Sequence, residues 1–176
     1  MIDGNAPAWR VHVGTAGVTC VRFAVPWLHA GDPWPLSAVV AHAGTLGAVR
    51  ADRPHAAGAG RGVPILHRQA MAWQGCALHL EAQRLDATAE VSLELPPWDE
   101  LVERVASERD VWDLVDTVAG ACTARWGAIG DGEALGDEPD LRRHAGVLVP
   151  LHHADGFGIT RPYTLLEGSG LAVLLR

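Results

Sequence analysis

The sequence predicts an α+β domain in which helices pack on one face of a mostly antiparallel sheet. Strand-like segments with alternating apolar and polar residues outnumber the helical ones, and the helical segments fall in two blocks. The predicted order is ββαβββααββ. The 176 residues match the size of one domain, and we see neither an internal repeat nor a domain boundary. Residues 1–176 are therefore treated as a single α+β domain.

Apolar and polar residues alternate along residues 9–25, which predicts two strands with residues 14–17 as their hairpin turn. Asp32 before Pro33 is typical of a helix start. Apolar residues then recur at helical spacing, so residues 33–49 are expected to form a helix.

The Gly-, Ala- and Arg-rich residues 50–62 are expected to form a loop, and residues 63–67 a short strand. Clearer strand patterns cover residues 76–81 and 90–95, where apolar residues alternate with polar and acidic ones. The link over residues 83–86 is short enough for an antiparallel hairpin. One face of this hairpin should be apolar and the other acidic.

Pro96 and Pro97 end that strand and open the main helical segment. Ser107, with Asp110 three residues later, resembles a capping box, so we expect a break there and a second helix over residues 108–126. Gly127 would stop this helix. Its buried stripe is expected to consist of Val111, Leu114, Val115, Val118, Cys122 and Trp126.

The last part of the chain returns to strands. Residues 127–145 are rich in Gly and Asp and are expected to be irregular. Apolar runs over residues 147–149 and 171–175 predict the final two strands, the second of which would seat the C-terminal residues in the sheet.

Acidic residues are concentrated in the middle of the chain. The formal net charge is −7, but residues 71–140 carry sixteen acidic residues against four Arg, whereas residues 1–70 carry six Arg against three acids. Exposed carboxylates of this kind speed association with a basic protein and repel nucleic acid, so we expect a protein partner with a basic surface and no nucleic acid. The candidate docking residues are Glu90, Glu94, Asp110, Asp113 and Asp116.

All 14 basic residues are Arg, and the absence of Lys excludes several mechanisms. A Schiff-base lysine, a phosphate-loop lysine and a kinase lysine are all ruled out. The Gly-rich residues 58–62 run into an extended segment rather than a helix N-terminus, which disfavours phosphate binding there. We expect no cofactor.

The cysteines and the chain start indicate a reducing compartment. Cys20, Cys76 and Cys122 are far apart in the chain and form no C-x-x-C motif, so buried, reduced thiols are expected. The first residues lack a basic start followed by an apolar run, and no stretch reaches the ~20 apolar residues of a membrane helix. A cytoplasmic protein without membrane contact is expected.

Signals for catalysis are unspecific. None of the four Ser residues lies in a G-x-S-x-G motif, and Cys76 and His79 fall on opposite faces of one predicted strand. A metal could be held by His144, His153 and Asp155, although their spacing matches no dedicated zinc pattern. An alternative function is therefore a small-molecule or metal-binding enzyme with a His-lined pocket between sheet and helices. The His residues that would line it are His79, His144, His152 and His153.

One segment resembles a known class of proteins. The strand over residues 87–95, the Pro-Pro pair, the acidic helix and the run ACTARWGA at residues 121–128 are similar to small bacterial immunity proteins of polymorphic toxin systems. The similarity covers about 40 of the 176 residues and carries no functional residue over. It implies a non-catalytic inhibitor of a toxin domain, and the acidic surface would suit a basic toxin such as a nuclease.

The sequence therefore favours a non-catalytic protein-binding domain with an acidic docking face, of which an immunity-type inhibitor is one form. The His-lined enzyme is the alternative. A structural or oligomer-forming subunit is a third possibility, so homo-oligomers stay open.

Overall fold

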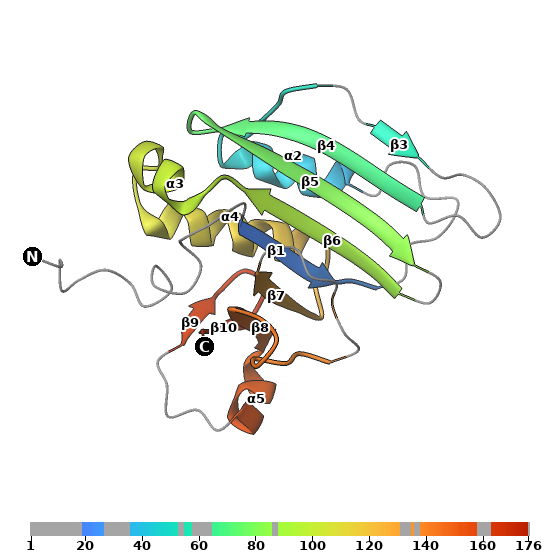
Figure 1. Cartoon of the computed structure of the whole chain (residues 1–176), viewed down its shortest axis with the longest axis vertical. Helices are drawn as coiled ribbons and strands as arrows, with labels where there is room; N and C mark the ends of the chain where they lie inside the picture. The colour runs from blue at the N-terminus through green and yellow to red at the C-terminus, as the bar shows by residue number, and fades with distance from the viewer. Residues whose placement is uncertain are drawn as a thin grey trace, which may run out of the picture.

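The structure is a computed structural model, shown in Figure 1. It describes residues 19–26, 36–52, 55–57, 65–85, 88–130, 135, 138–157 and 163–175. The strand and hairpin turn expected over residues 9–18 lie outside these ranges, as do the Gly-rich residues 58–62 and the start of the helix expected from residue 33.

Ten strands of the described chain form one sheet. They are β1 (Thr19–Ala24), β2 (Val49–Arg50), β3 (His55–Ala57), β4 (Ile65–Trp73), β5 (Cys76–Leu85), β6 (Thr88–Leu95), β7 (Trp126–Gly130), β8 (Gly146–Pro150), β9 (Thr164–Leu166) and β10 (Leu171–Leu175). Their order across the sheet is β2-β4-β5-β6-β1-β7-β8-β10-β9, and β3 pairs with β4. Each of the described pairings is antiparallel. Figure 1 shows β3 and β4 at one end of the sheet and β8 to β10 at the other.

Helical segments connect these strands. They are α2 (Ser37–Thr45), α3 (Trp98–Arg104), α4 (Glu108–Ala121), α5 (Leu151–Ala154) and the 3₁₀ turn η1 (Asp155–Phe157). The structure thus confirms the α+β class and the mostly antiparallel sheet that the sequence predicts.

Strand alternation gives β1, β4, β5 and β6 an apolar side. Val21 lies opposite Leu93, and Leu93 lies opposite Leu80, so these three buried residues share one face because paired residues point the same way. The same core cluster takes in the buried residues of α2 and α4, and these two helices contact each other. The main core therefore joins this sheet face to α2 and α4.

The helix α4 forms where the sequence places it and ends earlier than expected. Ser107 is the N-cap, and its hydroxyl oxygen accepts a hydrogen bond of 3.2 Å from the Asp110 backbone N–H. Cys122 is the C-cap, and Thr123 follows with a φ of 51°, which turns the chain out of the helix. Trp126 is therefore wrong as a member of the buried helical stripe, because it begins β7.

Several strands were not predicted. Gly127 lies within β7 instead of stopping a helix, and this strand replaces the first part of the irregular region expected over residues 127–145. The short strand expected over residues 63–67 continues to Trp73 as β4. The strands β2, β3 and β9 are short, and they lie in segments without a clear alternating pattern.

No helix of the described residues is both long enough and apolar enough to span a membrane.

Candidate functional site

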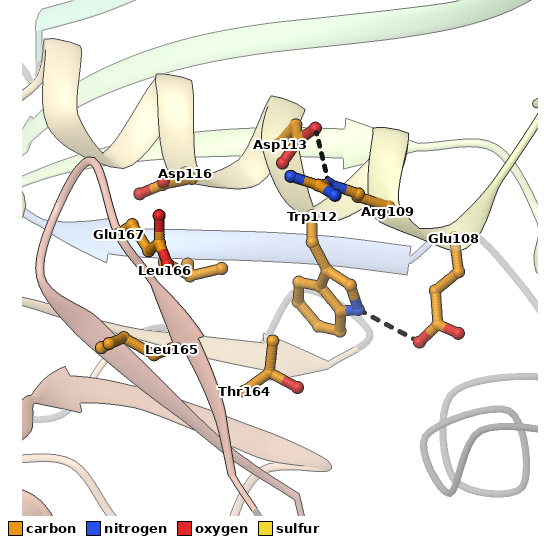
Figure 2. A pocket seen from close by; sticks show the side chains of 9 residues that line it. All are labelled: Glu108, Arg109, Trp112, Asp113, Asp116, Thr164, Leu165, Leu166 and Glu167. Atoms are coloured by element: carbon orange, nitrogen blue, oxygen red, sulfur yellow. Dashed lines mark hydrogen bonds and ion pairs between the residues drawn. The ribbon is translucent and has the colours of Figure 1, made fainter.

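A groove of about 460 Å³ opens between α4 and β9, and Figure 2 shows its side chains. Its two walls come from distant parts of the chain. Asp116 on one wall and Gly168 beside the other, for example, are 52 residues apart and share a hydrogen bond. The lining residues are Glu108, Arg109, Trp112, Asp113, Asp116, Thr164, Leu165, Leu166 and Glu167.

The wall formed by α4 centres on Trp112. Glu108, Trp112 and Asp116 follow each other at intervals of four residues, which places them on one side of the helix. The Trp112 indole packs partly against the core, and its Nε1–H donates a 3.1 Å hydrogen bond to Glu108 Oε1. Figure 2 shows the indole projecting from α4 toward Thr164. The ring is thus held in a fixed orientation at the groove.

Two charged residues stand on the exposed rim of this wall. Arg109 Nε lies 3.8 Å from Asp113 Oδ2, and the two side chains are 86% and 52% exposed. A pair this exposed is screened by water and contributes at most about 1 kcal/mol to stability. Both side chains can therefore change partner at little energetic cost.

The opposite wall is fixed by Asp116. The Gly168 and Ser169 backbone N–H groups each donate a 2.7 Å hydrogen bond to the Asp116 carboxylate, one to each oxygen. Leu166 is buried in the main core. The turn between β9 and β10 is therefore tied to α4, and the groove between them has a defined width.

The groove is strongly acidic. Of its nine lining residues four are carboxylic acids and one is Arg, and Asp116 is already engaged with backbone N–H groups. An indole face beside carboxylates suits a guanidinium or ammonium group, which can stack on the ring and pair with the acids. The arrangement can hold a cation, and the lining residues that the structure describes include no Ser or Cys nucleophile.

The five candidate docking residues lie in three parts of the structure: in the groove, near the β4–β5 turn and on β6. Asp113 and Asp116 line the groove. Asp110 lies one turn away, where its Oδ2 accepts a 3.4 Å hydrogen bond from Gln74 at the β4–β5 turn. Glu90 and Glu94 lie on β6 and alternate with core residues such as Leu93, so they face away from the core that α4 shares.

Glu90 is not a free surface acid. Its side chain is 7% exposed, and its Oε2 lies 3.2 Å from Arg22 Nη1, whose side chain is 20% exposed. Glu94 is less buried and accepts a 3.2 Å hydrogen bond from Arg68 Nη2. The expectation that these two acids stand in water is therefore wrong for Glu90, because the neighbouring strand supplies Arg22 as a partly buried partner.

The candidate His residues do not meet. His79 lies on β5 beside Glu94, with 3.8 Å between Nδ1 and Oε2, whereas His144 is buried just before β8. β5 and β8 are four strands apart in the sheet, which is roughly 19 Å at about 4.8 Å per strand. A pocket lined by all four His residues is therefore excluded.

The candidate metal ligands His144 and His153 differ in their exposure to solvent. His144 is 4% exposed, whereas His153 is exposed on α5, where its ring stacks edge-on against that of His152 with 4.2 Å between centroids. The Asp155 side chain lies outside the described residues. Within the described part of the chain, no group of three or more His, Cys, Asp or Glu side chains is placed to hold a metal ion.

The three cysteines are free thiols, of which Cys20 and Cys76 are buried and Cys122 is partly buried. Burial raises the pKa of Cys20 to about 11, against a smaller lowering by Arg22, and burial raises the pKa of Cys122 to about 12. Burial also raises the pKa of Cys76. These thiols stay protonated at neutral pH and are poor nucleophiles.

Sequence reasoning missed most of the groove. Glu108 and Trp112 could have been found from their four-residue spacing with Asp116, because that spacing lines one side of a helix. Thr164 and Leu165 gave no such signal, since a three-residue strand is too short to show alternation, and Glu167 lies in the turn that follows it.

The chain was compared with models of protein families and with curated protein sequences, and neither comparison found a match.

Proposed function

We propose that this chain is a non-catalytic protein-binding domain, and that the groove between α4 and β9 receives basic side chains of its partner. The observation that carries the proposal is that four carboxylic acids and the oriented indole of Trp112 line one groove of about 460 Å³. Carboxylates and an indole face together recognise guanidinium and ammonium groups better than either does alone.

The surroundings of the groove support binding over chemistry. Asp116 and Leu166 hold both walls in place before any partner arrives, so little ordering is needed on association. The exposed Arg109–Asp113 pair can open and offer Asp113 to an incoming cation. Electrostatic steering by the acidic middle of the chain would raise the association rate.

The test uses hexa-arginine as the probe and measures binding by calorimetry at several salt concentrations. The double variant Asp113→Asn with Glu167→Gln should weaken binding about tenfold or more and reduce its dependence on salt, because two groove charges are lost. The control is Glu103→Gln with Glu138→Gln, which removes the same charge from exposed positions outside the groove. Equal weakening by both double variants would show that only the overall charge matters and would reject the groove.

An immunity-type inhibitor of a basic toxin is the more specific form of this proposal, and it rests on the sequence resemblance. Purification from the native host at physiological salt, followed by mass spectrometry, should then recover a basic protein in a one-to-one complex. Recovery of no basic partner would remove this form.

The proposed compartment is the cytoplasm. We further propose that α2 and α4 cover one face of the sheet, since they share its apolar core.

A further inference from the structure

Among the described strands, β9 lies last in the sheet order, and its outer edge lies beside the groove. It ends the strand order, and among the described strands it pairs only with β10, through Leu171, Ala172 and Val173. An edge strand presents backbone N–H and C=O groups without a ladder partner, which is how sheets accept a further strand.

The hairpin turn shows which backbone groups face outward. The Gly170 N–H donates a 2.8 Å hydrogen bond to the Leu166 carbonyl, so that carbonyl points toward the β10 side. In an antiparallel ladder the N–H and C=O of one residue point the same way, and successive residues alternate. The N–H and C=O of Leu165 therefore point to the open edge.

The side chains of β9 show which face of an added strand would meet the groove. Leu166 is buried in the core that α4 shares, and α4 contacts β9, so Leu166 and Thr164 lie on the α4 side. Leu165 points to the other side and is 42% exposed. In Figure 2 the indole of Trp112 lies next to Thr164.

We infer that the partner contributes an extended segment which pairs with the open edge of β9 and carries basic residues on both sides of a central apolar residue. This inference rests on the proposed function and adds the mode of binding to it. The central residue lies opposite Leu165 and exchanges hydrogen bonds with its N–H and C=O. The two flanking side chains then point into the groove, and the central side chain covers Leu165.

Charge complementarity selects this occupant over others. The residues that the two flanking side chains would meet include Trp112, Asp113 and Glu167, so Arg at both positions is favoured. A second copy of this chain would bring an acidic surface to an acidic groove, since residues 71–140 carry sixteen acids against four Arg. A partner of opposite charge is the better fit.

The test uses the acetylated and amidated peptide Thr-Arg-Val-Arg-Thr and two singly N-methylated forms, with binding to the unaltered protein measured by calorimetry. N-methylation of the central valine removes the N–H that would donate to Leu165. N-methylation of the second arginine alters an N–H that would point away from β9, so this peptide is the matched control. We expect the valine form to bind about tenfold more weakly and the arginine form to bind like the parent.

Two variants of the protein test the same contact from the other side. Leu165→Pro removes the outward N–H and should also weaken the parent peptide about tenfold, whereas Leu165→Ala keeps that N–H and should change binding less. If Leu165→Pro does not fold, the N-methylated peptides still decide the question, because they leave the protein unchanged.

The outcomes separate the two proposals. Equal binding of both N-methylated peptides overturns strand addition, and hexa-arginine binding that depends on Asp113 and Glu167 would then leave the acidic groove standing. Failure of the parent peptide to bind also overturns strand addition. Loss of hexa-arginine binding as well would remove the proposed function itself.

Discussion

Asp116 and Gly168 are packed so closely that a side chain on the glycine would collide with the carboxylate. The Gly168 N–H donates a 2.7 Å hydrogen bond to Asp116 Oδ2, and a Cβ built on Gly168 would lie 2.9 Å from the same oxygen. This contact ties α4 to the β9–β10 turn across 52 residues of sequence. It is the contact that sets the width of the groove.

Gly168→Ala should therefore destabilise the protein by about 1 to 3 kcal/mol, because the carboxylate must move and lose its short hydrogen bonds. The measurement is denaturant unfolding followed by far-UV circular dichroism. The control is Gly44→Ala on α2, where an added Cβ meets nothing within 4 Å and should stabilise the helix by up to about 1 kcal/mol. Unchanged stability of Gly168→Ala would show that Asp116 does not hold this turn.

Substitution by Ala should destabilise the protein much more at Gly127 than at Gly130, although both glycines lie on β7. A Cβ on Gly127 would lie 2.7 Å from the Arg22 carbonyl oxygen and 3.0 Å from Phe23 Cδ1, whereas one on Gly130 meets nothing within 4 Å. Backbone of β1 cannot move aside without breaking its ladder, so Gly127→Ala should cost about 3 kcal/mol and Gly130→Ala less than about 1 kcal/mol. Thermal unfolding of both variants measures the difference, and similar melting temperatures would contradict the close approach of Gly127 to its paired strand β1.

The buried ion pair between Arg22 and Glu90 should be costly to break from one side. Glu90→Gln leaves the largely buried guanidinium without its charge partner and should destabilise by roughly 2 to 4 kcal/mol. Replacing both partners, as Arg22→Met with Glu90→Leu, should recover most of that loss because no buried charge remains.

The matched control is Glu94→Gln. Glu94 forms ion pairs with Arg68 and His79 that are more exposed than the pair between Arg22 and Glu90. The substitution should cost less than about 1 kcal/mol. Denaturant unfolding of the four proteins completes the measurement. Equal effects of Glu90→Gln and Glu94→Gln would mean that Glu90 is solvated like an ordinary surface acid.

Stability should fall at alkaline pH because of the buried thiols. Burial raises the pKa of Cys20 to about 11 in the folded protein from 9.0 in the unfolded chain. Above pH 9 the unfolded chain loses this proton first, so stability is complete below pH 9 and declines up to about pH 11 by up to about 1.4 kcal/mol per pH unit. Unfolding measured between pH 8 and 10.5 should show a shallower decline for Cys20→Ala than for the wild type. Parallel curves would contradict the burial of this thiol.

The sequence predicted the elements whose signals are local. The hairpin of β5 and β6 was readable because apolar residues such as Leu78, Leu80 and Leu93 alternate with polar ones over two full strands. The start of α4 was readable because Ser107 caps it with its own side chain. These signals lie within a few residues of the structure they specify.

The sequence did not predict what depends on distant parts of the chain. Trp126 continues the helical spacing of α4, yet it begins β7 because β1 offers Ala24 as its partner there. β9 exists because β10 pairs with it and Asp116 holds its turn. The acidic composition drew attention to Asp113 and Asp116, which line the groove, but the burial of Glu90 required knowing that Arg22 lies on the adjacent strand.

The position of β1 has a consequence for how the chain assembles. β1 lies between β6 and β7, and its registers join Val21 to Leu93 and to Ile129. Among the described strands, β1 is therefore the link between β2, β4, β5 and β6 on one side and β7, β8, β10 and β9 on the other. Pairing between strands that are distant in sequence is slow, so we expect the pairing of β1 with β6 and β7 to limit the folding rate. Chains in which this pairing fails would expose unpaired strand edges and would be prone to aggregate.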